Sequence, residues 1–271
     1  RPIFLSIIGL AYFGFLGALF QLNILLYAKN MMNVNDYQTS VLLVVLALGI
    51  GAGAMLAGKM SDEKVELGLV PLGSIGLTVF STALGFLYGS YVHVAICLFL
   101  LGISAGFYVV PLNSLIQYGS PLQERGKVLA TNNFLSFSAM LVGSLLLYAL
   151  RDGVQISAAQ IFIVVGIITF FGTTYVTSLL PLAFVRFVFW VLTHTLYRVR
   201  VINNKYVPKE GGALLVSNHV SLVDAFLILA GISRPIRFLV NRRIYEGKML
   251  NPLFRLTKAI PISARDTAEQ K

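Results

Sequence analysis

Six long apolar stretches, one after another, constrain this chain more than any other feature of its sequence. A helix that crosses a bilayer needs about 20 predominantly apolar residues. Charged residues make up only 12% of the 271, about half the share in a soluble domain. Residues 1–180 are therefore predicted to form an α-helical membrane domain with six spans. The predicted spans are Ile3 to Tyr27, Ser40 to Ala57, Leu69 to Tyr88, Val92 to Ile116, Val128 to Leu150 and Gln160 to Leu180.

The basic residues divide unevenly between the two sides of this predicted membrane domain. Only Lys29 and Arg151 fall on one side. The other side carries the rest, together with everything after Pro181: Arg1, Lys59, Lys64, Arg125 and Lys127. Cytoplasmic loops carry an excess of Lys and Arg. Both ends of the six-helix part are therefore predicted to be cytoplasmic, which an even number of spans allows.

After Pro181 the composition changes, with fourteen Lys or Arg against five Asp or Glu. Beside six spans, this basic excess favours the anionic inner leaflet over nucleic acid as its partner. Residues 181–200 are apolar and aromatic but interrupted by Arg186. They are predicted to form an interfacial amphipathic helix, in which Phe187 and Trp190 dip into the bilayer. The alternative is a seventh span, which would bury Arg186 and carry the basic tail outside.

Residues 201–271 read as a mainly parallel α/β unit, because strand and helix patterns alternate. The predicted strands are 211–217, 236–241 and 259–263, and the predicted helices are 221–232 and 249–256. Three strands are few for an independent core, so we expect this unit to be the first part of a larger domain. The single cysteine, Cys97, excludes an internal disulfide and a cysteine-based metal site, and no metal is expected.

The stretch "LLVSNHVSLVDAF" places a histidine and a carboxylate in the water-soluble part of the chain. His219 and Asp224 are five residues apart, so on one helix they would point about 140° away from each other. They can meet if His219 lies in the turn before the helix and Asp224 lies in its first turn. Asp224 would then hold the imidazole in one tautomer, as a general base requires. On the alternative interpretation, Ser221 and Asp224 only cap the helix.

"NHVSLVD" resembles the first motif, N-H-x-S-x-x-D, of the glycerolipid acyltransferases, and Asn218, His219, Ser221 and Asp224 match it. The resemblance implies that His219 and Asp224 are catalytic. The histidine would deprotonate a glycerol hydroxyl, which attacks an acyl thioester, and the aspartate would orient the histidine. Asn218 and Ser221 would be substrate-binding.

"AIPISARD" looks like a second motif of that family, and implies that Arg265 contacts the phosphate of the acceptor. The resemblance implies no cofactor, with acyl-acyl carrier protein or acyl-CoA as co-substrate. Two later motifs of the family do not occur in the chain. We therefore expect a fragment that is inactive as a transferase by itself.

"GKMSDEKVELG" resembles the loop motif of the major facilitator superfamily, in which Gly58 and Asp62 match but the later basic residues do not. Transporters of this kind consist of two six-helix halves with a binding site near the membrane midplane. Six amides within or beside the predicted spans are candidates for a transport cavity, because intramembrane polar groups are costly and often line such cavities. Contacts between helices are the alternative role for these amides: Gln21, Asn23, Asn113, Gln117, Asn132 and Asn133.

The order of the two parts resembles the bacterial lysophospholipid transporters that are fused to a 2-acylglycerophosphoethanolamine acyltransferase. This resemblance implies uptake of a lysophospholipid across the bacterial inner membrane, coupled to its reacylation by a cytoplasmic domain. Two alternatives stay open. The soluble part could be a catalytically inactive lipid-binding module, or the helices could be only a scaffold for a membrane-anchored acyltransferase.

Overall fold

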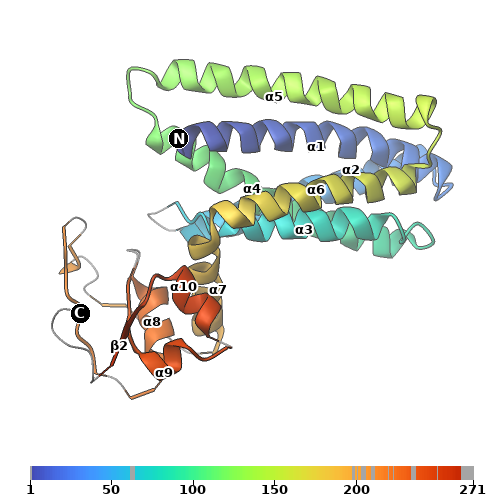
Figure 1. Cartoon of the computed structure of the whole chain (residues 1–271). Helices are drawn as coiled ribbons and strands as arrows, with labels where there is room; N and C mark the ends of the chain where they lie inside the picture. The colour runs from blue at the N-terminus through green and yellow to red at the C-terminus, as the bar shows by residue number, and fades with distance from the viewer. Residues whose placement is uncertain are drawn as a thin grey trace. The chain divides into compact units, whose positions relative to one another are not determined.

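The computed structural model describes residues 2–61, 65–196, 199, 201–202, 206–208, 211–218, 220–221, 223–232, 236–248 and 250–263. The chain divides into two compact units, Arg1–Leu180 and Pro181–Lys271. Each unit is built around its own helices, which Figure 1 shows in colours from blue to red along the chain.

The described residues of the first unit form a bundle of six helices (Figure 1). Five of them are long and apolar enough to cross a membrane, and α3 is a shorter apolar helix. This confirms an α-helical membrane domain. The helices are α1 (Pro2–Asn30), α2 (Asp36–Ser61), α3 (Leu69–Leu84), α4 (Tyr91–Gly119), α5 (Arg125–Tyr148) with a π-helical extension (Ala149–Gly153), and α6 (Ala158–Leu179).

Helix α3 ends earlier than its apolar stretch predicts. The stretch was predicted to continue to Tyr88, but the helix has 16 residues and ends at Leu84. At 1.5 Å per residue this is about 24 Å, less than the roughly 30 Å of a bilayer's hydrocarbon core. The chain turns at Gly85, where a Cβ atom would overlap the Ile163 side chain of α6. A close approach to α6, invisible in the hydropathy pattern, therefore accompanies the end of the helix.

Glycines bring α2 and α4 into close contact. A Cβ atom at Gly49 or Gly53 of α2 would overlap the backbone of α4, and one at Gly102 or Gly106 of α4 would overlap the backbone of α2. Small residues at such positions let two helix backbones approach in a membrane. The remaining contacts join α1 to α5, α4 and α6, and join α3 to α4 and α6.

Hydroxyl groups connect α6 to α3 and α1 inside the bundle. The Thr173 hydroxyl donates a hydrogen bond to the Ser74 carbonyl oxygen at 2.9 Å and lies 2.8 Å from the Thr78 hydroxyl. The Tyr12 hydroxyl donates to the Thr169 hydroxyl oxygen at 3.0 Å. Side-chain hydrogen bonds between membrane helices contribute modestly, about 0.6 kcal/mol on average. Part of the intramembrane polarity therefore joins helices to one another.

The second unit contains a parallel pair of strands, as predicted for an α/β unit. Strands β1 (Leu239–Asn241) and β2 (Ile260–Ile262) pair in parallel, with Val240 opposite Pro261. Each is shorter than the predicted strand. The helices of this unit are α7 (Pro181–Leu196), α8 (Val223–Gly231), α9 (Arg242–Tyr245) and α10 (Asn251–Leu256).

The predicted strand at 211–217 is wrong for this structure. Residues 211–218 have no strand assignment, and Leu214 and Val216 are 84% and 81% exposed. A strand needs a neighbour that pairs with its backbone groups. In the described part of the chain the sheet consists of β1 and β2 alone.

Helix α7 packs against α8 within the second unit. The Phe189 and Phe226 rings stack with centroids 4.3 Å apart and an angle of 11° between their planes. Phe187, predicted to dip into the bilayer, is buried with 2% of its surface exposed. The amphipathic pattern thus produced a helix, but part of its apolar surface is buried within the protein.

Candidate functional site

The turn before α8 is organised by the Asp224 carboxylate. Its Oδ2 atom accepts hydrogen bonds from the backbone N–H groups of Val220 at 2.7 Å and Ser221 at 2.8 Å. The Asp224 N–H in turn donates to the Ser221 carbonyl oxygen at 3.0 Å. Asp224 lies in the first turn of α8, where the helix dipole favours a negative charge.

Ser221 completes a reciprocal cap at the same helix end. Its hydroxyl oxygen accepts a hydrogen bond from the Val223 N–H at 3.3 Å, while its own N–H donates to Asp224. Two of the four N–H groups that concern this turn therefore have side-chain acceptors, as in a capping box. The capping predicted from S-x-x-D is present, although the hydroxyl acts on the residue before Asp224.

The remaining site residues are only partly described by the structure. Asn218 is exposed and belongs to the irregular segment before the turn. The predicted general base, His219, and the predicted phosphate ligand, Arg265, both lie outside the described residues. The structure does show that Asp224 binds the N–H of Val220, the residue that follows His219. The carboxylate thus reaches back across the turn, as the proposed pairing requires.

Helix α7 supports the helix that carries Asp224. Phe226, two residues after Asp224, is the ring that stacks on Phe189. Further along α7, the Trp190 ring stacks on His194 at a centroid distance of 4.5 Å, and the Trp190 carbonyl oxygen lies 2.8 Å from the His194 Nδ1 atom. The sequence contained the aromatic pattern that marks α7, but nothing in it identified α8 as the partner.

Two of the six predicted cavity amides are buried inside the bundle. The Asn23 side chain of α1 donates through Nδ2 to the Ala158 carbonyl oxygen at 2.9 Å and is 1% exposed. Asn132 of α5 is 9% exposed. Among the described residues, the Oδ1 atoms of both are buried without a hydrogen-bond partner. A buried acceptor without a partner is unfavourable by about 1–3 kcal/mol.

The structure does not bring the six amides together at one place. Asn113 is half-buried and donates to the Val109 carbonyl oxygen of its own helix at 3.3 Å. Leu112 of α4 lies beside Gly9 of α1, and Gly9 is 14 residues from Asn23, or roughly 20 Å along the helix. The amides of α4 are therefore near one end of α1, and Asn23 is near the other. The other three are exposed on the first unit: Gln21, Gln117 and Asn133.

The loop motif is also only partly described. Gly58 lies in the last part of α2, which continues to Ser61, and is therefore helical and exposed rather than part of a loop. A Cβ atom at Gly58 would meet no atom within 4 Å. Asp62 lies outside the described residues. Within those residues no group of three or more His, Cys, Asp or Glu could hold a metal ion.

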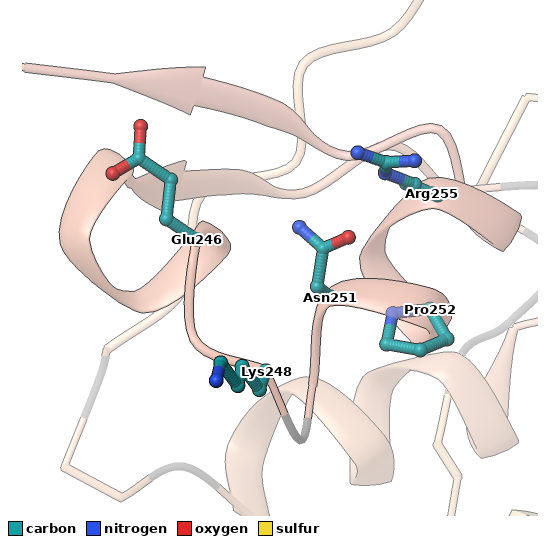
Figure 2. Close-up of a pocket in the computed structure, with 5 residues that line it drawn as sticks. All are labelled: Glu246, Lys248, Asn251, Pro252 and Arg255. Carbon is teal, nitrogen blue, oxygen red and sulfur yellow. The ribbon is translucent and has the colours of Figure 1, made fainter.

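A surface pocket of the second unit was missed altogether by the sequence analysis. Glu246, Lys248, Asn251, Pro252 and Arg255 line it (Figure 2). These residues belong to none of the recognised motifs. The only available signal was the mixture of charges around a proline in "EGKMLNPLFR".

Comparisons with known proteins divide the chain in the same order as its composition. Residues 1–144 match the family model of the Major Facilitator Superfamily. Residues 198–271 match the family model described as Acyltransferase. The chain is thus a multi-pass membrane protein that carries an acyltransferase domain. No solved structure matches it.

Curated relatives match the membrane part. The lysophospholipid transporter LplT of Enterobacter sp. (strain 638) is 30% identical over 144 residues, which are 51% of this chain and 34% of the relative. The transporters of the same name from Yersinia pestis (strain Pestoides F) and Yersinia pseudotuberculosis serotype O:3 (strain YPIII) are 32% identical over 126 residues, which are 45% of this chain and 28% of each relative. The chain spans about a third of the length of these relatives. The facilitator model covers more than half of the chain, which therefore belongs to the Major Facilitator Superfamily.

Proposed function

We propose that this chain belongs to a protein that transports a lysophospholipid across the bacterial inner membrane and reacylates it. The observation that carries the proposal is the joining of two activities in one chain. Relatives of the six-helix unit are named lysophospholipid transporters, and an acyltransferase domain follows that unit. A lysophospholipid delivered to the inner leaflet would be a ready acceptor for such a domain.

In the proposed reaction His219 is the general base. It takes the proton of a lysophospholipid hydroxyl, the oxygen attacks the carbonyl carbon of an acyl thioester, and a new ester bond forms. The C–S bond then breaks, and the thiolate leaves as the thiol after it receives the proton from the imidazolium. Asp224 orients the imidazole and stabilises its charged form, in the manner of other base–carboxylate pairs.

The neighbouring residues take supporting roles in this proposal. Asn218 and Ser221 contact substrate at the turn, and Arg265 binds the phosphate of the acceptor, since arginine is well suited to phosphate. The acyl donor is acyl-acyl carrier protein or acyl-CoA, and the reaction needs no cofactor. The basic second unit faces the cytoplasmic leaflet, whose anionic lipids attract Lys and Arg.

The geometry of Asp224 also fits the second candidate, a catalytically inactive lipid-binding module. Its two backbone hydrogen bonds would hold the turn whether or not a histidine used the carboxylate. General base catalysis typically contributes about 10²–10⁴-fold, so loss of the base distinguishes the two candidates sharply.

The experiment uses the full-length protein and His219→Ala. We expect this variant to lose acyl transfer by a factor within that range, while it stays folded. Arg265→Ala should instead raise the KM for the acceptor, as expected for a lost contact in the ground state. Near-normal transfer in folded His219→Ala protein would refute the mechanism and leave the inactive module as the better interpretation.

A further inference from the structure

The pocket between α9 and α10 has a cavity volume of about 410 Å³. Small-molecule sites typically have volumes of roughly 300–1,000 Å³. Helix α9 begins directly after β1, so the wall formed by Glu246 follows one short helix beyond the carboxyl end of that strand. Ligands of open α/β sheets bind at the carboxyl ends of the strands.

The charges in this pocket are separated. Lys248 and Arg255 are exposed at its rim, and Figure 2 shows Glu246 and Arg255 on opposite sides of Asn251. Within the described part of the chain, neither cation forms an ion pair with a carboxylate, and neither does Glu246. The surroundings are basic, because residues 236–263 contain six Lys or Arg and one acidic residue, Glu246.

Asn251 is fixed in place at the centre of the pocket. Its Nδ2 atom donates a hydrogen bond to the Tyr245 carbonyl oxygen at 2.7 Å. The Tyr245 ring also stacks on Phe254 of α10, with centroids 5.9 Å apart. Two helices and the central amide are thereby held together, so the pocket keeps its shape without a ligand. The fixed Nδ2 leaves the Oδ1 atom as an acceptor on the same side chain.

We propose that this pocket binds the headgroup of the lysophospholipid acceptor when that headgroup is zwitterionic, a phosphodiester joined by a short arm to an ammonium group. Lys248 and Arg255 bind the phosphate through charge-assisted hydrogen bonds. Glu246 and the Asn251 Oδ1 atom accept hydrogen bonds from the ammonium. The inference rests on the proposed function, and assigns headgroup selection to residues outside the acyltransferase motifs.

The carboxylate distinguishes this ligand from the acyl donor. The pantetheine arm of an acyl donor also carries a phosphodiester, but it has no ammonium group. Glu246 would repel such an arm, whereas it attracts the cationic end of a zwitterion. The chemistry of the whole pocket therefore fits the acceptor better than the donor.

Calorimetric titration of the full-length protein in detergent tests the pocket without requiring catalysis. The probes are glycerophosphoethanolamine, glycerophosphoglycerol and coenzyme A. The double variant Lys248→Gln/Arg255→Gln should bind both glycerophosphodiesters at least about tenfold more weakly, since each loses charged hydrogen bonds. Glu246→Gln should weaken only glycerophosphoethanolamine. Lys258→Gln, at an exposed position outside the pocket, is the matched control and should bind as the wild type does.

Each other outcome has a definite meaning. Unchanged binding in all variants overturns the headgroup site, because binding by the membrane unit does not depend on these side chains. Weakened binding of coenzyme A alone overturns the assignment and gives the pocket to the donor. If the variants behave as expected but the wild type transfers no acyl group, the proposed reaction fails while the headgroup site stands.

Discussion

One oxygen atom of Asp224 serves two backbone amides, and this sets what the residue can do. Oδ2 accepts from Val220 and Ser221 and fixes the turn just after His219. The same carboxylate, in the first turn of a helix, is favoured in its charged form. Capping and orientation of a histidine are thus compatible roles, because both need an ionised Asp224 that reaches back across the turn.

Two substitutions at Asp224 separate these roles. In Asp224→Asn the side-chain oxygen can still accept the amide hydrogen bonds, so we expect stability close to that of the wild type. Asp224→Ala loses the cap and should be destabilised by about 0.5–2 kcal/mol. Both should lose acyl transfer by roughly 10²–10⁴-fold, because neither can stabilise an imidazolium. Thermal unfolding and transfer assays on the full-length protein measure the two effects.

The decisive comparison is Asp224→Asn with the wild type. If its transfer rate stays within a few-fold while Asp224→Ala unfolds earlier, Asp224 is only a cap. Transfer that falls in parallel with stability across both variants has the same meaning.

At the scale of elements, apolar length predicted the membrane helices because a bilayer imposes that length on any span. Alternation of strand and helix predicted β1, β2 and their parallel pairing. The strand at 211–217 could not be judged from its own residues, since pairing depends on a neighbour. The stacking of Phe189 on Phe226 was hidden for a similar reason. Periodicity marks an apolar face, but it does not name the surface that covers it.

The contact between α2 and α4 offers a prediction about an element pair. Gly53→Leu places a side chain where even a Cβ atom would overlap Ile103 of α4. Overpacking of this kind is unfavourable by typically 1–3 kcal/mol. We therefore expect the purified protein to lose its fold at a lower temperature in detergent, measured by loss of helical circular dichroism.

Gly51→Leu, in the same helix, is the matched control, because a Cβ atom at Gly51 meets nothing within 4 Å. It should melt at or slightly above the wild-type temperature, since leucine is the better helix former. Equal melting temperatures for the two leucine variants would show that the close α2–α4 approach does not exist in the membrane protein.

For the whole molecule, the uneven distribution of basic residues predicts the topology. Lys59 and Asp152 are exposed and lie on opposite sides of the predicted membrane domain. In a Cys97→Ala background, cysteines introduced at these two positions should react with an impermeant thiol reagent from opposite sides. The Lys59 position should react only after the inner face is opened. Labelling of both positions in intact cells would contradict the six-helix topology.

The fusion of two units predicts that uptake and acyl transfer can be lost separately. Asn132→Leu removes a buried oxygen without a partner, so it should raise the melting temperature if it changes packing alone. If that oxygen accepts a hydrogen bond from the transported lipid, uptake into vesicles should fall about tenfold, the equivalent of about 1.4 kcal/mol. Transfer to detergent-dispersed lysolipid should then be unchanged. His219→Ala should show the reverse, with normal uptake and no transfer. Normal uptake by a stabilised Asn132→Leu protein would remove Asn132 from the transport path, and loss of both activities in either variant would contradict the separation of the two units.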